Sequence, residues 1–254
     1  MSPNLKVVIV IPARYKSSRF EGKPLAKILG EPMILRVCKI CAEVLDMENI
    51  YVATDDVRIK NTVEAYGFNA VMTSETHPTG TDRIAEVSSL VDADLYINVQ
   101  GDEPVVDPND ISQIIEEKIK YPNCVIKGFS KITAEEDPDN LNMVKVVFTE
   151  AKKMIYMSRS RLPGAKNTQY SDTVYHKAVC IYAFNKEELQ AYAKFGRKSD
   201  LEMIEDIEIL RFLDLDIDVR LVETNSISLA VDEPDDILKV ENHIIKLEQG
   251  KGRL

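Results

Sequence analysis

Strand-like apolar runs alternate with helix-like segments along the first 120 residues, and this alternation constrains the fold more than any other feature. The stretch 6–11 is an almost continuous apolar run, which is typical of a strand buried on both faces of a parallel sheet. Further strands are expected at 50–53, 70–72 and 95–99, with helices at 33–45, 56–66, 81–90 and 110–119. This order predicts a doubly wound α/β sheet, which binds ligands at the carboxyl ends of its strands.

The second half of the chain is organised differently. Strands are expected at 144–148, 154–157 and 178–184, in hairpins or insertions. Helices at 186–194 and 201–213, a strand at 219–222 and a helix at 234–247 follow. Because no low-complexity linker or internal repeat divides the two halves, we predict one domain with an inserted lid or dimerisation arm.

Composition excludes several classes of protein. The formal net charge of −10 argues against non-specific nucleic-acid binding, which needs clustered positive charge. No apolar run approaches the ~20 residues of a membrane span, and the start of the chain lacks a signal segment, so a cytoplasmic location is expected. The four cysteines are too few for a disulfide framework. Cys38 and Cys41 share one helix face and are interpreted as core thiols, because no second Cys or His pair completes a zinc site.

A basic loop follows the first strand. Residues 12–25 contain two hydroxyls, a glycine and four cations, namely Arg14, Lys16, Arg19 and Lys23. Such groups at the carboxyl end of a buried strand are suited to holding a triphosphate, although a solvated basic loop would have the same composition. The loop is not a P-loop, since Ser17 stands in place of a glycine and Pro24 in place of the Ser or Thr that would bind magnesium.

Two acidic segments complete the candidate chemistry. Asp102, in the segment 100–104, follows an apolar strand and would face the same crevice as the basic loop, where a carboxylate can hold Mg²⁺ against phosphates. Asp232 lies in the segment 231–236. An Asp before Glu-Pro at a helix start is also an ordinary N-cap, and this segment alone does not separate the two interpretations.

In order and spacing, these segments resemble the motifs of the 3-deoxy-manno-octulosonate cytidylyltransferases, the CMP-Kdo synthetases, which are relatives of the CMP-sialate synthetases. The similar segments are 11–25, 52–55, 79–83, 98–104 and 231–234, with shorter ones at 144–147 and 156–159. The resemblance covers nearly the whole chain.

The resemblance implies a Rossmann-like, doubly wound mixed sheet of the nucleotidyltransferase type, with a nucleotide half at about 1–125 and an acceptor, lid and dimer half at about 126–254. It also implies a cytoplasmic, magnesium-dependent homodimer that makes a CMP-activated sugar acid from CTP for lipopolysaccharide or capsule. The implied catalytic residues are Lys23, Arg14 and Asp102. Those near CTP are Ala13, Arg14, Ser17, Arg19, Lys23, Thr79, Arg83 and Gln100. Those near the acceptor are Gln100, Ala178, Tyr182, Glu205, Glu208 and Ile209. The implied magnesium ligands are Asp102 and Asp232, which hold one metal ion or two.

The acceptor half departs from the family pattern. Ala178 stands where the family usually has a His that helps to bind the sugar acid, and Ile209 stands in place of a Gln. His176 lies two residues earlier, on the same strand face but about 7 Å away. We therefore expect either Kdo or a related 2-keto-3-deoxy acid, such as a nonulosonic or modified sugar acid, as the acceptor. A nucleotide-binding protein without turnover is the third interpretation, which the retained Lys23, Asp102 and Asp232 disfavour.

Overall fold

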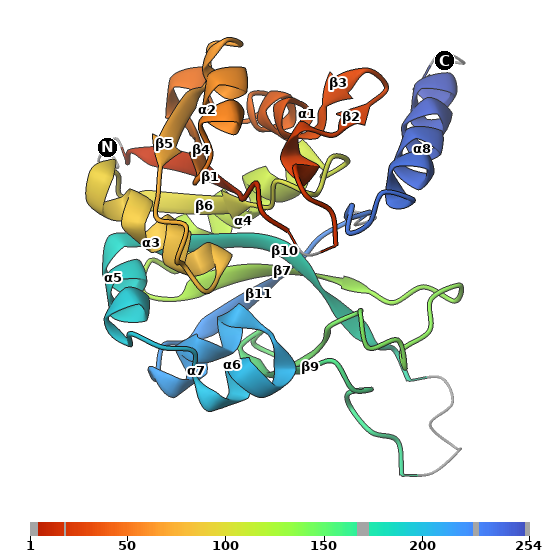
Figure 1. Ribbon diagram of the computed structural model, residues 1–254. Coiled ribbons are helices and arrows are strands. Elements are labelled where there is room, and N and C mark those ends of the chain that lie inside the picture. The colour runs from red at the N-terminus through yellow and green to blue at the C-terminus, as the bar shows by residue number, and fades with distance from the viewer. Residues whose placement is uncertain (1–4, 18, 167–172, 226–228, 252–254) are drawn as a thin grey trace.

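The structure, a computed structural model, describes residues 5–17, 19–166, 173–225 and 229–251, and a mixed sheet forms its centre (Figure 1). The strands are β1 (Val7–Ala13), β2 (Lys27–Ile28), β3 (Glu31–Pro32), β4 (Ile50–Thr54), β5 (Asn69–Met72), β6 (Leu95–Val99), β7 (Val125–Lys131), β8 (Lys145–Phe148), β9 (Met154–Ser158), β10 (His176–Asn185) and β11 (Val219–Glu223). The main order of the nine-stranded sheet is β11-β7-β10-β6-β1-β4-β5, with β8 and β9 paired to each other beside β10. β10 runs antiparallel to β6 and β7, and the other neighbours along this order are parallel.

Helices cover both faces of this sheet (Figure 1). They are α1 (Met33–Cys41), α2 (Val57–Glu64), α3 (Gly80–Leu90), α4 (Pro108–Lys120), α5 (Lys186–Lys194), α6 (Asp200–Glu205), α7 (Arg211–Asp214) and α8 (Asp236–Lys251). Buried side chains of α1, α2 and α4 form one apolar cluster with the sheet, and those of α3, α5 and α7 form another. The two clusters lie on opposite faces because successive strand residues alternate between them. The predicted doubly wound mixed sheet is confirmed.

Helix α8 packs away from the main sheet. Its Val240 and Ile244 contact Ile28 of the β2–β3 hairpin, together with Met33 and Val231. This small cluster holds the chain before α8 against the first half of the molecule, beside α1 (Figure 1).

One expectation about local structure is wrong, and one strand was not predicted. The single helix expected at 201–213 is broken, because Asp206 adopts a left-handed backbone (φ 50°) and the chain resumes as a 3-10 turn over Glu208–Leu210 before α7. The break lets Ile209 and Leu210 enter the core. Strand β7 was not expected, because Lys127 and Gly128 interrupt its apolar run; pairing with β10 on one side and β11 on the other makes it a strand.

The expectation of core thiols at the C-x-x-C segment is confirmed. Cys38 and Cys41 are free, fully buried side chains of α1, and burial raises the pKa of Cys38 to about 12. A thiol with such a pKa is protonated at neutral pH and is a poor nucleophile or metal ligand. In the part of the chain that the structure describes, no helix is long and apolar enough to cross a membrane.

Candidate active site

Three segments that are remote in sequence converge beyond the carboxyl ends of β1 and β6. Lys23 Nζ donates to Asp102 Oδ2 at 2.6 Å and to the Val231 carbonyl at 2.8 Å. The amide of Val231 donates to the carbonyl of Asp102 at 2.9 Å, and Arg19 pairs with Asp232 at 2.8 Å. The structure therefore brings together the basic loop and both acidic segments that the sequence singled out.

Local geometry explains the glycines in these segments. A Cβ on Gly101 would lie 2.9 Å from the carbonyl oxygen of Pro12, so only glycine lets the loop after β6 approach the end of β1. Gly22 has φ 69°, in the left-handed region, and its amide donates to the Tyr15 carbonyl at 2.8 Å. This turn folds the basic loop back on itself and places Lys23 above Asp102.

Asp232 is not the N-cap of the last helix. Helix α8 begins at Asp236, whose Oδ2 accepts hydrogen bonds from the amides of Asp232 and Glu233 at 3.0 Å. The Asp232 carboxylate instead reaches across to Arg19. The N-cap interpretation is therefore wrong, and the carboxylate is available at the convergence point.

The donor set at this point fits magnesium. Asp102 and Asp232 supply carboxylate oxygens, the ligands that this hard cation prefers. Among the described residues, no group of three or more His, Cys, Asp or Glu side chains could hold a metal ion on its own. Because Mg²⁺ usually keeps several waters and binds through one or two carboxylates plus substrate phosphates, two carboxylates beside a basic loop suit this ion.

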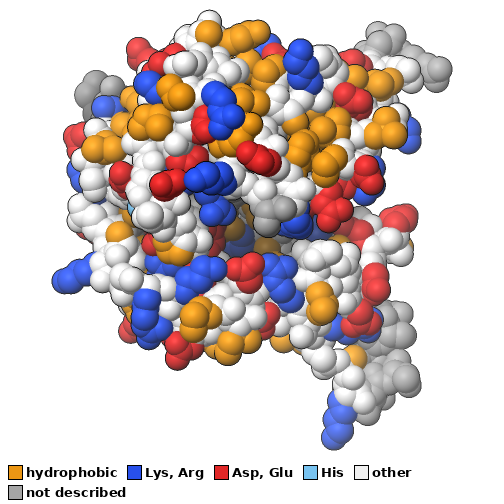
Figure 2. All heavy atoms as spheres, in the orientation of Figure 1, with side chains coloured by type: hydrophobic (Ala, Val, Ile, Leu, Met, Phe, Trp, Pro, Cys, Tyr) orange, Lys and Arg blue, Asp and Glu red, His pale blue; other side chains and the backbone are white. Residues whose placement is uncertain are grey.

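Most of the residues expected near the nucleotide lie around the end of β1. Ala13 closes β1 and is buried, Arg14 follows it and is exposed, and Ser17 is half-buried. Within the described residues Arg14 takes part in no ion pair, so its charge is available to a phosphate. Figure 2 shows Lys and Arg side chains gathered around a hollow between the two halves of the molecule.

Arg83 and Thr79 are tied into the interior instead. Arg83 is 1% exposed and donates to Asp55 at 3.2 Å, while the other carboxylate oxygen of Asp55 accepts from the Tyr15 amide at 3.1 Å. Burial lowers the pKa of Arg83, and the charge of Asp55 opposes this shift. Thr79 is the N-cap of α3 and accepts from the amide of Asp82 at 3.1 Å. Both residues position the start of α3 and the loop after β1.

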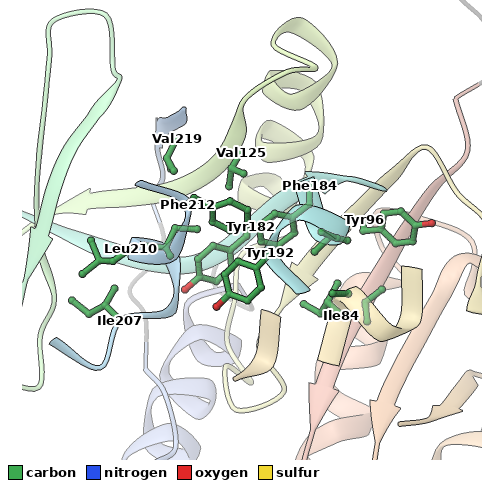
Figure 3. Close-up of a cluster of buried hydrophobic side chains, with 14 of the residues drawn as sticks. Ile84, Tyr96, Val125, Tyr182, Phe184, Tyr192, Ile207, Leu210, Phe212 and Val219 are labelled. Carbon is green, nitrogen blue, oxygen red and sulfur yellow. The ribbon is translucent and has the colours of Figure 1, made fainter. Parts of the chain in front are cut away.

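The residues expected near the acceptor fall into two groups. Gln100 and Glu208 approach each other at the start of α3, since both lie within 4 Å of the place where a Cβ of Gly80 would be. Glu208 accepts from the Thr81 amide at 3.0 Å, and burial raises the pKa of its carboxyl group. Tyr182 and Ala178 lie on the sheet face that α3 covers, and both are at least partly buried. Figure 3 shows Tyr182 beside Tyr192 within the core cluster on this face.

Two of these residues point elsewhere. Glu205 accepts from Ser158 Oγ at 2.8 Å and from the Arg159 amide at 2.9 Å, so it anchors the end of β9. Ile209 has no exposed surface and packs in the core, because the turn before α7 directs it inward. The Ile209 side chain therefore does not face a ligand.

His176 does not replace the missing histidine in this conformation. Its ring lies 5.4 Å from the ring of Phe129 and 5.0 Å from that of Phe148, centroid to centroid. Burial, with the nearby charge of Lys152, lowers the pKa of His176. The imidazole is thus part of an aromatic cluster between β7, β8 and β10.

One charged residue near the acceptor group was missed from the sequence. Lys127 lies in the middle of β7, is 2% exposed and has Nζ 3.9 Å from the centroid of the Tyr182 ring. Its signal was a single cation inside the run Val125–Phe129, which is unusual for a buried strand. Because apolar and polar residues do not alternate in this run, the sequence did not indicate that Lys127 lies in a strand.

The chain is similar to known proteins over most of its length. A family model described as "Cytidylyltransferase" matches residues 8–221. An 8-amino-3,8-dideoxy-manno-octulosonate cytidylyltransferase of Shewanella putrefaciens is 42% identical, over 94% of this chain and 99% of the relative. A 3-deoxy-manno-octulosonate cytidylyltransferase of Syntrophotalea carbinolica is 38% identical over the same shares.

Solved structures agree with these relatives. A CMP:2-keto-3-deoxy-manno-octonic acid synthetase complexed with CTP is 38% identical and superimposes with a TM-score of 0.88, over 95% of this chain and 99% of the other. A glucose-1-phosphate thymidylyltransferase of Bacillus anthracis has a TM-score of 0.66 at 15% identity, over 94% of each chain, which shows a shared fold.

Proposed function

Because the chain belongs to the cytidylyltransferase family, we propose that it transfers CMP from CTP to a 3-deoxy-manno-octulosonate-type sugar acid and releases pyrophosphate. The observation that carries this proposal is the convergence of Lys23, Asp102 and the Val231–Asp232 segment beyond the ends of β1 and β6. A cation, two carboxylates and a glycine turn at that place suit a nucleoside triphosphate with its metal ion.

In the proposed reaction, the anomeric oxygen of the sugar acid forms a bond to the α-phosphorus of CTP. The bond from that phosphorus to the bridging oxygen breaks and pyrophosphate leaves with the electron pair. The proton of the anomeric hydroxyl passes to solvent water. We assign Lys23, Arg14, Ser17 and Arg19 to the phosphates and Gln100 and Glu208 to the acceptor. Positioning and charge neutralisation by these side chains supply most of the rate enhancement, since phosphoryl transfer needs little covalent chemistry from the protein.

We assign Asp102 and Asp232 to Mg²⁺. When bound, this ion would neutralise charge on the phosphate oxygens. The structural support is the oxygen donor set and the pairing of each carboxylate with a phosphate-loop cation. A homodimer, which the family resemblance implies, stays a prediction that sedimentation velocity tests.

The activity is tested by pyrophosphate release from CTP and Mg²⁺ with a panel of sugar acids. We expect release with Kdo or with a modified 2-keto-3-deoxy acid and none without an acceptor. CTP binding without release for any acceptor would instead indicate a nucleotide-binding protein.

The amino-substituted acid is a second candidate acceptor. Relatives that share about two fifths of this sequence are named for either the 8-amino or the 8-hydroxy sugar. Ala178 also removes a polar partner that a polyol would use. Competition between Kdo and its 8-amino analogue for limiting enzyme decides between them. The variant Ala178→His should turn over Kdo better than wild type does if this position sets the preference.

A further inference from the structure

Among the residues whose burial the structure describes, three lysines are almost completely buried, and they differ in how their charge is satisfied. Lys118 donates to both carboxylate oxygens of Glu188 at 2.7 Å and to two backbone carbonyls. Lys145 donates to the carbonyls of three residues, Asn140, Met143 and Arg159. Lys127 donates to one carbonyl, that of Val179, at 3.2 Å, and its charge lies over the Tyr182 ring.

Lys127 is therefore the under-satisfied member of this set. An ammonium carries three N–H donors and pairs best with a carboxylate. No ion pair of Lys127 exists within the described residues, and one carbonyl and one aromatic face leave donors unused. Burying a cation without a directly paired counter-ion is costly, so Lys127 favours an anionic partner within hydrogen-bond distance of its ammonium.

The neighbours of Lys127 place it beside the proposed acceptor site. Lys127 is paired with Tyr182 across β7 and β10, and Tyr182 is paired with Asn98 across β10 and β6. Paired residues share one face of a sheet, so these three side chains form a row on the face that α3 covers. Beside this row a register shift in β10 separates Val179 from Tyr182. Cys180, which lies within that bulge, and Ala178 are half-buried. Solvent therefore reaches this part of the sheet face.

A further buried polar side chain lies on this face without a partner. Neither amide atom of Asn98 makes a hydrogen bond, although the residue is fully buried. Buried polar side chains are normally hydrogen-bonded, and exceptions at one place indicate a missing partner. Gln100 and Glu208, the polar residues assigned to the acceptor, lie at the start of α3 above this row and are half-buried.

We propose that Lys127 is a specificity-determining residue of the acceptor site and that its ammonium binds the carboxylate of the acceptor sugar acid. This inference rests on the proposed function, because the sugar acid is the anionic substrate that the hollow between the two halves (Figure 2) must bind in addition to CTP. The carboxylate would fill the unused donors of Lys127 and give the buried charge its counter-ion. Burial lowers the pKa of Lys127, and the nearby carboxylates of Glu208 and Glu103 act in the opposite direction. A bound carboxylate would reinforce that opposing effect and favour the charged lysine.

The test compares wild type with Lys127→Met, which keeps an unbranched side chain but has no charge. Lys131→Met is the matched control, since Lys131 lies on the same strand but is exposed and paired with Glu223. Each protein is assayed by pyrophosphate release with the preferred sugar acid, and the 1-carboxamide of that acid is measured as a competing inhibitor. KM for CTP, KM for the acceptor and kcat are determined separately.

Lys127→Met should raise KM for the acceptor about ten- to a hundredfold and leave KM for CTP within about twofold of wild type. Wild type should bind the acid at least about tenfold better than its carboxamide, and Lys127→Met should lose most of this preference. A merely structural lysine would not change the preference of the site for an acid over its amide. The control should match wild type in every measurement.

Three outcomes would overturn the inference. They are an unchanged acceptor KM in Lys127→Met, a retained preference for the acid in that variant, or equal binding of acid and carboxamide by wild type. The last measurement needs no variant, so it decides the matter even if Lys127→Met fails to fold. A wild type that releases no pyrophosphate with any sugar acid contradicts the proposed function, and this inference with it.

Discussion

Opposite charges neutralise each other in the candidate active site at the scale of single residues. Lys23 and Arg19, which we assign to phosphates, are paired with Asp102 and Asp232, which we assign to the metal. The Lys23–Asp102 pair is half-buried, whereas the Arg19–Asp232 pair is largely exposed and contributes little by itself. Substrate binding would exchange the partners, so that phosphates take the cations while the metal ion takes the carboxylates.

Two lysines of the basic loop, Lys23 and Lys16, allow a site residue and a control to be compared. Lys23→Ala should lose most of the activity, because a phosphate charge stays unpaired as pyrophosphate develops. Lys16→Ala should change activity little, since Lys16 is 84% exposed and paired only with the exposed Glu75. Steady-state kinetics of both variants check this expectation. Equal losses would show that the assignment of roles within the loop is wrong.

The two carboxylates are tested by removing their charge. Asp102→Asn and Asp232→Asn should each lower kcat at least about a hundredfold, which is ~2.7 kcal/mol of transition-state stabilisation. Asp92→Asn is a suitable control, because Asp92 is exposed and pairs with Lys186 on the surface. Magnesium titrations of activity, with circular dichroism to verify folding, make the comparison. Near-normal turnover of either site variant at saturating magnesium would remove that residue from the metal site.

At the scale of elements, adjacent aspartates after β4 divide two tasks. Asp55 joins the loop after β1 to Arg83 of α3 through two hydrogen bonds. Asp56 is the N-cap of α2 and accepts from the amide of Arg58 at 2.8 Å. The turn after β4 thus starts α2 and also holds the loop after β1 against α3, beside the candidate active site.

The cap of α2 predicts a pH-dependent contribution to stability. The side-chain hydrogen bond from Arg58 holds the pKa of Asp56 below its usual 3.8. A carboxyl group with a depressed pKa in the fold stabilises the protein above its unfolded pKa, and this contribution is lost as the pH falls through the folded value. Asp56→Asn keeps a capping side chain, so its difference from wild type should be small at pH 7 and should vanish at low pH.

Asp56→Ala removes the cap and should cost about 1 kcal/mol in the free energy of unfolding at neutral pH. Urea unfolding of the three proteins at pH 7 and near pH 3 separates the two effects. A difference between wild type and Asp56→Asn that grows on acidification would contradict the assignment.

At the scale of the whole molecule, the sheet joins the two halves of the chain. β10, from the second half, lies between β6 of the first half and β7. The aromatic core on one face is likewise built from α3 of the first half and from α5 and α7 of the second. Neither half has a complete sheet or core without the other.

This topology predicts one cooperative unfolding transition. Separating the halves would expose the edge of β6 and the buried side chains shared by α3 and α5, so neither half should persist alone. Differential scanning calorimetry should give one transition whose calorimetric and van't Hoff enthalpies agree. Two resolved transitions would show that the halves are separate domains.

The sequence alone was sufficient to predict the parallel strands of the first half, the loops that follow them and the residues gathered at their ends. These features are local, because apolar runs, glycine turns and motif spacing depend on neighbouring residues. The expected strand 95–99 and the loop 100–104, for example, appear where the pattern placed them.

Only the tertiary structure decided which side chains of the converging segments pair with each other and which way some side chains point. The pairing of Lys23 with Asp102 and of Arg19 with Asp232 spans 79 and 213 residues, and no local pattern encodes it. Strand β7 and the buried Lys127 likewise depend on the two strands that flank them, because pairing on both sides outweighs a polar residue in the run. The turn at Asp206 directs Ile209 into the core for the same reason: burial against distant partners, rather than local propensity, determines the path of the chain there.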